Sequence, residues 1–262
     1  MNEHLLQINM FGSFSIKNGS KTLMLTKNRE SRKLHLLQYL IHNRGKDVPT
    51  EKLVDVIYEG EEIDNPVKAL QVLITRLRKA LIEAGLPVRE YILFSGGMYS
   101  WNTQIPCRID TYEFEKAIKQ ARLPGQTSER RIELYTSAVE LYNGDFLPNL
   151  SGYSWAAVTS AYYSNLFLQA IDEAWEILSE KGDYEGMLKL CAKGTEVYPS
   201  EERLHIISIS CFIKENRLKE AQAAYKAIVE LLLNEWGVEP SAELQELYQI
   251  IAARKEGTQL QL

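Results

Sequence analysis

Seven side chains between residues 68 and 79 have the types and the spacing to contact a nucleic acid. They are Lys68, Gln71, Val72, Thr75, Arg76, Arg78 and Lys79. At 100° per residue they spread over the outer faces of a helix predicted over residues 66–84, while leucines and Ile74 share its inner face. Arginine can donate two hydrogen bonds to guanine, glutamine can pair with adenine, and valine can pack on a thymine methyl group. The chemistry of this segment is therefore compatible with reading DNA bases.

The ends of this helix are well marked. Asn65 is a good N-cap, Pro66 suits the first helical position, and Gly85 can take the left-handed conformation that stops a helix. A basic face on an amphipathic helix is also typical of ordinary solvated surface. The helix alone does not decide between these two interpretations.

The neighbouring segments favour nucleic-acid contact. Residues 29–46 predict a helix that ends at Gly45, and Thr50 is predicted to cap a short helical run before the basic helix. After it, residues 91–101 predict a hairpin whose Gly96-Gly97 turn tolerates positive φ. Three helices followed by a hairpin fit a winged helix-turn-helix, in which the third helix enters the major groove of DNA.

Upstream of the helices, residues 5–26 show short alternating runs that break at Phe11-Gly12 and at Asn18-Gly19. Such breaks predict a small antiparallel sheet. Strand-like residues are expected to cease at Pro106, and we predict a domain boundary there. The expected domains are residues 1–105, an α+β winged helix, and residues 106–262, an all-α domain; the chain is mainly α overall.

Charge divides in the same way. The 262 residues carry a net charge of −5, but residues 1–107 hold 14 lysines and arginines against 11 acids, a net charge of +3. Residues 108–262 carry the remaining −8. An acidic half would repel a phosphate backbone, so it is expected to meet protein rather than nucleic acid.

The second half shows amphipathic segments separated by short breaks. From Gly182, a position 34 residues on is Asn216, and this shift places Leu218 under Tyr184 and Ala221 under Met187. That interval is the tetratricopeptide period. Met187 stands where a small residue is usual, so an irregular helical bundle remains the alternative.

Several motifs occur in a characteristic order. They are FGSF at 11–14, ITRLRKAL at 74–81, Tyr99, Asp110 with Phe114, LYNGDFL at 141–147, Trp155, and WGVEPSAEL at 236–244. Over almost its whole length the chain thereby resembles the Streptomyces antibiotic regulatory protein type. That type joins an OmpR-like winged helix to a bacterial transcriptional activator domain of tetratricopeptide-like helices.

The resemblance implies that Lys68, Gln71, Val72, Thr75 and Arg76 face the major groove, whereas Arg78 and Lys79 lie nearer backbone phosphates. The chain departs from the pattern in its wing. Met98 precedes Tyr99 where a glycine is usual, and no lysine or arginine lies between Tyr91 and Trp101. A basic wing residue in the minor groove is therefore not expected.

An acidic loop precedes the basic helix and contains Glu59, Glu61, Glu62 and Asp64. Near phosphates it would be repulsive, so it is expected to point away from DNA. In OmpR-like proteins the corresponding loop can face RNA polymerase, which the resemblance carries over as a hypothesis. The alternative is a solvated turn whose Asp64 favours the start of the helix.

Other classes of function lack a motif. The chain has no G-x-x-x-x-G-K-[ST] loop for nucleotides and no nucleophile elbow, and its four histidines and three cysteines show no metal-ligand spacing. We expect no enzyme activity, no catalytic residue, no metal and no cofactor. Without a run of 18 apolar residues or a signal peptide, we also expect no membrane association and a bacterial cytoplasmic protein at the nucleoid.

Two functions follow as hypotheses. The first is a transcription regulator, expected to be an activator, that binds double-stranded DNA and uses its helical domain for dimerisation or for a partner; a homodimer on direct repeats and RNA polymerase are the expected partners. The second is an interaction adaptor, whose tetratricopeptide groove binds a protein while the winged helix no longer binds DNA. Salt-dependent retention on duplex DNA separates the two.

Overall fold

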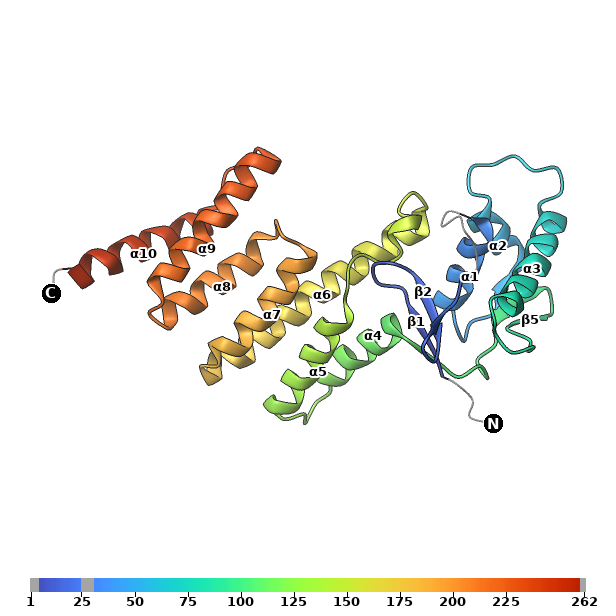
Figure 1. Ribbon diagram of the computed structural model, residues 1–262, viewed down its shortest axis with the longest axis horizontal. Helices are drawn as coiled ribbons and strands as arrows, with labels where there is room; N and C mark the ends of the chain where they lie inside the picture. Colours follow the sequence, from blue (N-terminus) through green and yellow to red (C-terminus); the bar gives the residue numbers. More distant parts are fainter. Residues whose placement is uncertain (1–4, 25–30, 260–262) are drawn as a thin grey trace. The chain divides into compact units, whose positions relative to one another are not determined.

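The computed structural model describes residues 5–24 and 31–259 (Figure 1). Contacts divide it into two compact units. Unit 1 comprises Met1–Glu113 with Gly144–Ser164, and unit 2 comprises Phe114–Asn143 with Asn165–Leu262. The architecture is that of a small α+β unit and an all-α unit, as the sequence predicts. The segment Gly144–Ser164 groups with the N-terminal half although it lies far along the chain.

Unit 1 begins with a four-stranded sheet in the order β3-β2-β1-β7. The strands are β1 (Leu6–Asn9), β2 (Ser15–Asn18), β3 (Lys21–Thr22) and β7 (Cys107–Ile109). The predicted antiparallel hairpin is present, and Gly19 has a positive φ of 59° in its turn. The prediction that strand residues cease at Pro106 is wrong. β7 pairs in parallel with β1, because Ile109 is buried beside Ile8.

Three helices follow the first strands of the sheet: α1 (Arg32–His42), α2 (Thr50–Ile57) and α3 (Pro66–Glu83). Ser31 caps α1 by accepting a hydrogen bond from the amide of Leu34. The predicted start of this helix at residues 29 and 30 lies outside the described residues. The predicted end of this helix at Gly45 is too late. α1 ends at His42 with Asn43 as its C-cap, and Gly45 lies in the turn beyond, with a φ of 85°.

The role predicted for Thr50 is wrong. Thr50 is the first residue of α2, and no side chain caps this helix. Its hydroxyl instead donates to the carbonyl of Gly97, at 2.7 Å, in the turn of the hairpin. Thr50 therefore ties α2 to the wing.

The hairpin itself is confirmed. It consists of β5 (Ile92–Ser95) and β6 (Met98–Trp101), and the short strand β4 (Val48–Pro49) pairs with β6. Gly96 and Gly97 both have positive φ, 57° and 79°, as a two-residue turn of this kind requires. Trp101 and Tyr99 point into the unit and are buried, so the hairpin packs on its own domain.

The segment Gly144–Ser164, which we call the brace, is hydrogen-bonded to the N-terminal part of unit 1. It contains a short 3₁₀ turn (η1, Pro148–Leu150) and the first turns of α6 (Ser154–Lys181). The amide of Leu147 donates to the carbonyl of Met10, and the amide of Gly12 donates to the carbonyl of Asp145. Leu147 adopts a left-handed conformation, with a φ of 42°, to make this connection.

Unit 2 is helical throughout the part that the structure describes. Its elements are α4 (Asp110–Ala121, from Phe114), α5 (Ser128–Leu141), α6 from Asn165, α7 (Tyr184–Val197), α8 (Glu202–Lys214), α9 (Leu218–Leu231), a π-helical turn (η2, Leu232–Trp236) and α10 (Ala242–Gln259). None of the described helices is both long enough and apolar enough to cross a bilayer.

The spacing of these helices bears out the 34-residue period. α7 begins at Tyr184 and α9 at Leu218, and the two helices end at Val197 and Leu231. Each α9 position is 34 residues after its α7 counterpart. Met187 is as fully buried as Ala221, its equivalent, so the larger side chain is accommodated in the core.

Candidate nucleic-acid interface

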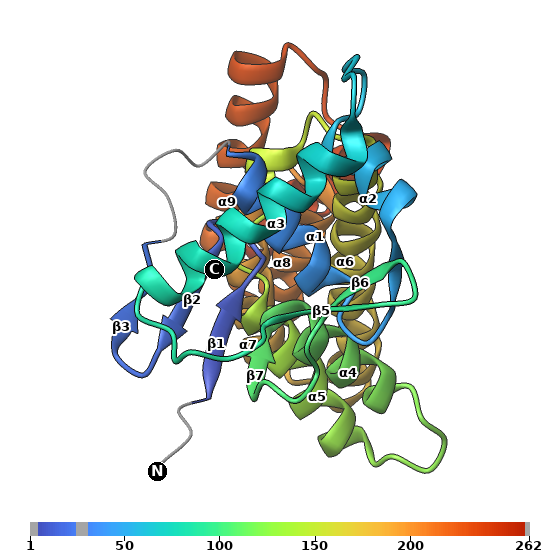
Figure 2. The same ribbon diagram turned by 90° about the vertical axis from the view of Figure 1, so that its right-hand side faces the viewer.

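The outer face of α3 is open to solvent along its length. Six of the seven predicted contact residues are exposed: Lys68, Gln71, Val72, Thr75, Arg76 and Lys79. Val72 is 43% exposed although it is apolar. Figure 2 shows α3 crossing the front of unit 1, with the hairpin β5–β6 below it. The predicted residues are therefore brought together on one surface.

The opposite face holds α3 in place. Leu70, Ile74, Leu77 and Leu81 are each at most 2% exposed. Asn65 caps the helix by accepting a 3.0 Å hydrogen bond from the amide of Lys68. Since the helix is fixed at its start and along its inner side, its outer side chains have a defined position.

Arg78 differs from the other six residues. Its guanidinium Nη2 donates a 2.6 Å hydrogen bond to the carbonyl of Ile92 in β5, and its side chain is half-buried. This bond joins the helix to the hairpin. That Arg78 also contacts a phosphate stays a prediction, because a guanidinium has further donors.

Two smaller contacts qualify the surface. The hydroxyl of Thr75 donates to the carbonyl of Gln71, one turn back, so it is free only as an acceptor. In the wing, Phe94 is 54% exposed and its ring lies 4.6 Å from that of Tyr99. The hairpin therefore exposes an aromatic side chain, and its sequence contains no lysine or arginine between Tyr91 and Trp101.

The acidic loop is partly engaged within unit 1. Glu61 forms a salt bridge with Arg32 at 2.5 Å, and Glu59 accepts hydrogen bonds from the hydroxyl and the amide of Ser154 at the start of α6. Those two carboxylates hold the loop against α1 and the brace. Glu62 and Asp64 are exposed, and their side chains form no salt bridge or hydrogen bond with another described residue.

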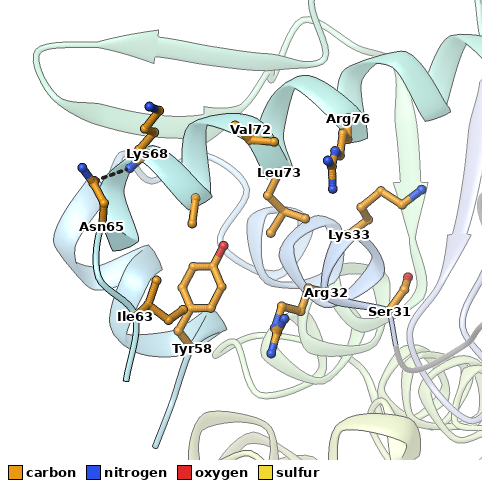
Figure 3. A pocket seen from close by; sticks show the side chains of 11 residues that line it. Ser31, Arg32, Lys33, Tyr58, Ile63, Asn65, Lys68, Val72, Leu73 and Arg76 are labelled. Atoms are coloured by element: carbon orange, nitrogen blue, oxygen red, sulfur yellow. Dashed lines mark hydrogen bonds between the residues drawn. The ribbon is translucent and has the colours of Figure 1, made fainter. Parts of the chain in front are cut away.

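A hollow of about 720 Å³ lies beside α3 (Figure 3). α3 forms one side of it with Lys68, Val72 and Arg76, and the start of α1 and the end of α2 form the other. Four of the lining residues are cationic and none is acidic. Sequence reasoning missed its α1 side, Arg32 and Lys33, although the signal was two adjacent cations directly after the cap residue Ser31.

Trp155 of the brace contacts two histidines of α1, His35 and His42. The indole Nε1 of Trp155 donates to Nε2 of His35 at 3.0 Å, and the two rings are stacked. Burial lowers the pKa of His35 to about 4, against a smaller opposing effect of Glu59. Burial also lowers the pKa of His42 to about 4. Both histidines are thus neutral near pH 7, and both rings pack against Trp155.

Asp110, the first residue of α4, is hydrogen-bonded to the residues that follow β1. Its carboxylate accepts hydrogen bonds of 2.7–2.9 Å from the amides of Met10, Phe11 and Thr111. Burial raises the pKa of this carboxyl to about 6, although the amide donors favour its charged form. Within the described ranges, no group of three histidine, cysteine or acidic side chains lies close enough to hold a metal ion.

Comparison with protein families gives two matches. The profile described as "Bacterial transcriptional activator domain" matches residues 109–252. The profile described as "Transcriptional regulatory protein, C terminal" matches residues 26–95, which contain α1, α2 and α3. Together the two profiles cover most of the chain in the order expected from its motifs.

Individual proteins are similar at lower identity. Regulatory protein AfsR of Streptomyces coelicolor is 26% identical over 219 residues, 82% of this chain and 21% of AfsR. Regulatory protein DnrI of Streptomyces peucetius is 25% identical over 261 residues, 96% of this chain and 94% of DnrI. The chain thus spans about a fifth of the length of AfsR and nearly all of DnrI.

A solved structure described as "Mycobacterium tuberculosis EmbR in complex with low affinity phosphopeptide" is similar with a TM-score of 0.65. Its identity to this chain is 18%, and the match covers 96% of this chain and 66% of that one. At this identity the likeness concerns the fold.

Proposed function

Because the chain belongs to the bacterial transcriptional activator domain family and is a DNA-binding regulator of the Streptomyces antibiotic regulatory protein type, we propose that it reads its operators with α3. In this proposal the outer face of the helix lies in the major groove. The observation that carries it is the exposure of Lys68, Gln71, Val72, Thr75, Arg76 and Lys79 on a helix fixed from behind.

The roles within this face follow from chemistry. Arg76 is exposed and has the geometry for a bidentate contact to guanine, and Gln71 has that for adenine. Val72 is suited to a thymine methyl group, since an exposed valine between polar side chains gains apolar contact there. Lys68 is assigned to the major groove near the start of the helix, and Lys79, near its end, to a backbone phosphate.

The proposal is tested with a duplex selected from a random pool by the whole chain. Arg76→Ala is expected to weaken binding to this duplex by about 1–3 kcal/mol and to relax the preference for one base pair. Lys226→Ala, which removes a cation exposed on α9, is the control for charge alone. Equal affinities of wild type and Arg76→Ala would contradict the proposal.

The adaptor alternative is separated by the salt dependence of binding. A regulator that neutralises several phosphates loses affinity steeply as salt rises. An adaptor shows no retention on duplex DNA at any salt concentration. The uncharged wing and the net charge of −5 favour the adaptor, whereas the regulatory profile over residues 26–95 supports the regulator.

We further propose that RNA polymerase meets the tip of the acidic loop. Glu62 and Asp64 are assigned this contact, because Glu59 and Glu61 already bind Ser154 and Arg32. Glu62→Ala with Asp64→Ala is expected to lower transcription from a target promoter without changing DNA affinity. Transcription that is unchanged by this double variant would remove the polymerase contact from the account.

The assignment of different partners to the two parts of the chain is also a proposal. Residues 1–105 are assigned to DNA and residues 106–262 to a second copy or another protein, with a homodimer on direct repeats as the expected complex. The acidic charge of the second part supports this assignment, since it disfavours phosphate. Chromosomal DNA as the ligand puts the protein in the bacterial cytoplasm, at the nucleoid.

A further inference from the structure

The hollow beside α3 has the properties of an anion site. In a chain with a net charge of −5, its walls carry Arg32, Lys33, Lys68 and Arg76 and no acidic residue. Glu61, which lines an adjoining hollow with Tyr58 and Ile63, forms a salt bridge with Arg32. The remaining cations give the hollow a net positive charge.

Two of these cations, Lys33 of α1 and Arg76 of α3, line the hollow from different helices. Figure 3 shows the guanidinium of Arg76 pointing from α3 toward the place where Lys33 leaves α1. Neither side chain forms a salt bridge or a hydrogen bond with another described residue. Since like charges repel, two cations that line one hollow, neither of them paired with a carboxylate of the described residues, gain most from a polyanion that contacts each of them.

The position of the hollow identifies the anion. A helix in the major groove has a phosphate backbone on each side of it, because the groove is about 12 Å wide and a helix fills it. The hollow borders α3 on the side of α1. The hairpin, which also packs against α3, has no lysine or arginine between Tyr91 and Trp101.

We propose that a backbone phosphate of one DNA strand enters the hollow and is held by Lys33, beside the Arg76 that is assigned to a guanine. This inference rests on the proposed reading of the major groove by α3. It adds Lys33, which no motif marked, as a residue that fixes the position of the recognition helix on the duplex.

The test is ethylation interference on a selected duplex, combined with the salt dependence of binding. With the wild-type chain, ethylation of a phosphate on one strand of each half-site is expected to block binding. Lys33→Gln is expected to tolerate ethylation of this same phosphate. The slope of log affinity against log salt is expected to fall in magnitude by about one, with equal weakening on specific and unrelated duplexes. Lys33→Arg should restore both properties.

Lys17→Gln is the matched control, because Lys17 is an exposed lysine of the same unit on β2. If Lys33→Gln keeps the wild-type interference pattern and salt slope, as Lys17→Gln should, the inference fails while the proposed function stands. If the wild-type chain selects no duplex at all, the proposed function fails instead. Binding of inorganic phosphate that depends on Lys33, together with DNA affinity that does not, would assign the hollow to free phosphate and overturn the inference.

Discussion

Arg76 and Arg78 are two positions apart on α3, and their guanidinium groups have different surroundings. Arg76 is exposed at the hollow, whereas Arg78 is half-buried and bound to the carbonyl of Ile92. The sequence could identify both as cations of a recognition helix. It could not assign their roles, because the role depends on which side of the helix the hairpin packs.

Arg78 is therefore expected to position the wing. Arg78→Gln removes a charge-assisted hydrogen bond of the kind worth about 1.5–3 kcal/mol, and amides of β5 and β6 should exchange hydrogen faster. Arg76→Gln, with the same change of charge on the same helix, should leave this exchange unaltered. Native exchange rates in the hairpin of Arg78→Gln would show that the bond to Ile92 does not hold the wing.

His35 makes the stability of unit 1 depend on pH. Because its pKa is lowered to about 4 in the folded chain, the unfolded chain binds more protons as pH falls from about 6.5 to 4, and stability is lost in this window. Asp110, whose pKa is raised to about 6, acts in the opposite direction over part of it. His42, whose pKa is also lowered to about 4, acts in the same direction as His35. The three effects must be separated by substitution.

His35→Phe is expected to reduce the loss of unfolding free energy between pH 7 and pH 5 by about 1–2 kcal/mol. The variant should be less stable than wild type at pH 7, since the indole of Trp155 loses its acceptor. Denaturant unfolding at both pH values measures the difference, and Asp110 is present in both proteins. An unchanged pH dependence would contradict a neutral, buried His35.

Among the elements, the hydrophobic periodicity and the turn residues made most bounds predictable. α3 was marked by its cap, its proline and its glycine, and the hairpin by Gly96 and Gly97. β7 and the brace were not predictable in this way. Their partners, β1 and α1, lie about a hundred residues away, and no local pattern encodes such a pairing.

The helical repeat has its own test. Gly194 lies inside α7, where an added Cβ would stand 2.8 Å from Cδ1 of Leu204 and 3.1 Å from Cδ1 of Ile171. Gly194→Ala should destabilise unit 2 by about 1–3 kcal/mol through overpacking, less the gain of about 1 kcal/mol in helix propensity. Gly257→Ala in α10, where nothing lies within 4 Å, is the control and should be neutral or stabilising. Thermal unfolding that ranks Gly194→Ala with the control would contradict the packing described.

At the scale of the whole molecule, charge differs between the part proposed to bind DNA and the part proposed to contact protein. The surplus of cations is gathered on α3 and at the start of α1, and the acidic surplus falls in residues 108–262. The sequence was sufficient to predict the fold class and the open face of α3. The α1 side of the hollow was not predicted, because it exists only where the folded chain brings Lys33 close to α3.

Selected binding sites are expected to be direct repeats whose centres lie about one helical turn, 10–10.5 base pairs, apart. A head-to-tail pair of chains places two α3 helices on one face of the duplex in this arrangement. Changing the spacing by five base pairs should abolish joint occupancy in a mobility-shift titration. Joint occupancy at every spacing, or inverted repeats, would exclude head-to-tail pairing.

The central claim is that α3 lies in the major groove with Arg76 on a guanine. Dimethyl sulfate methylates guanine N7 in the major groove and adenine N3 in the minor groove, so a protection pattern on the selected duplex reports the groove directly. We predict protection of guanine N7 that disappears in Arg76→Ala. Protection confined to adenine N3, or guanine protection that persists without Arg76, would contradict it.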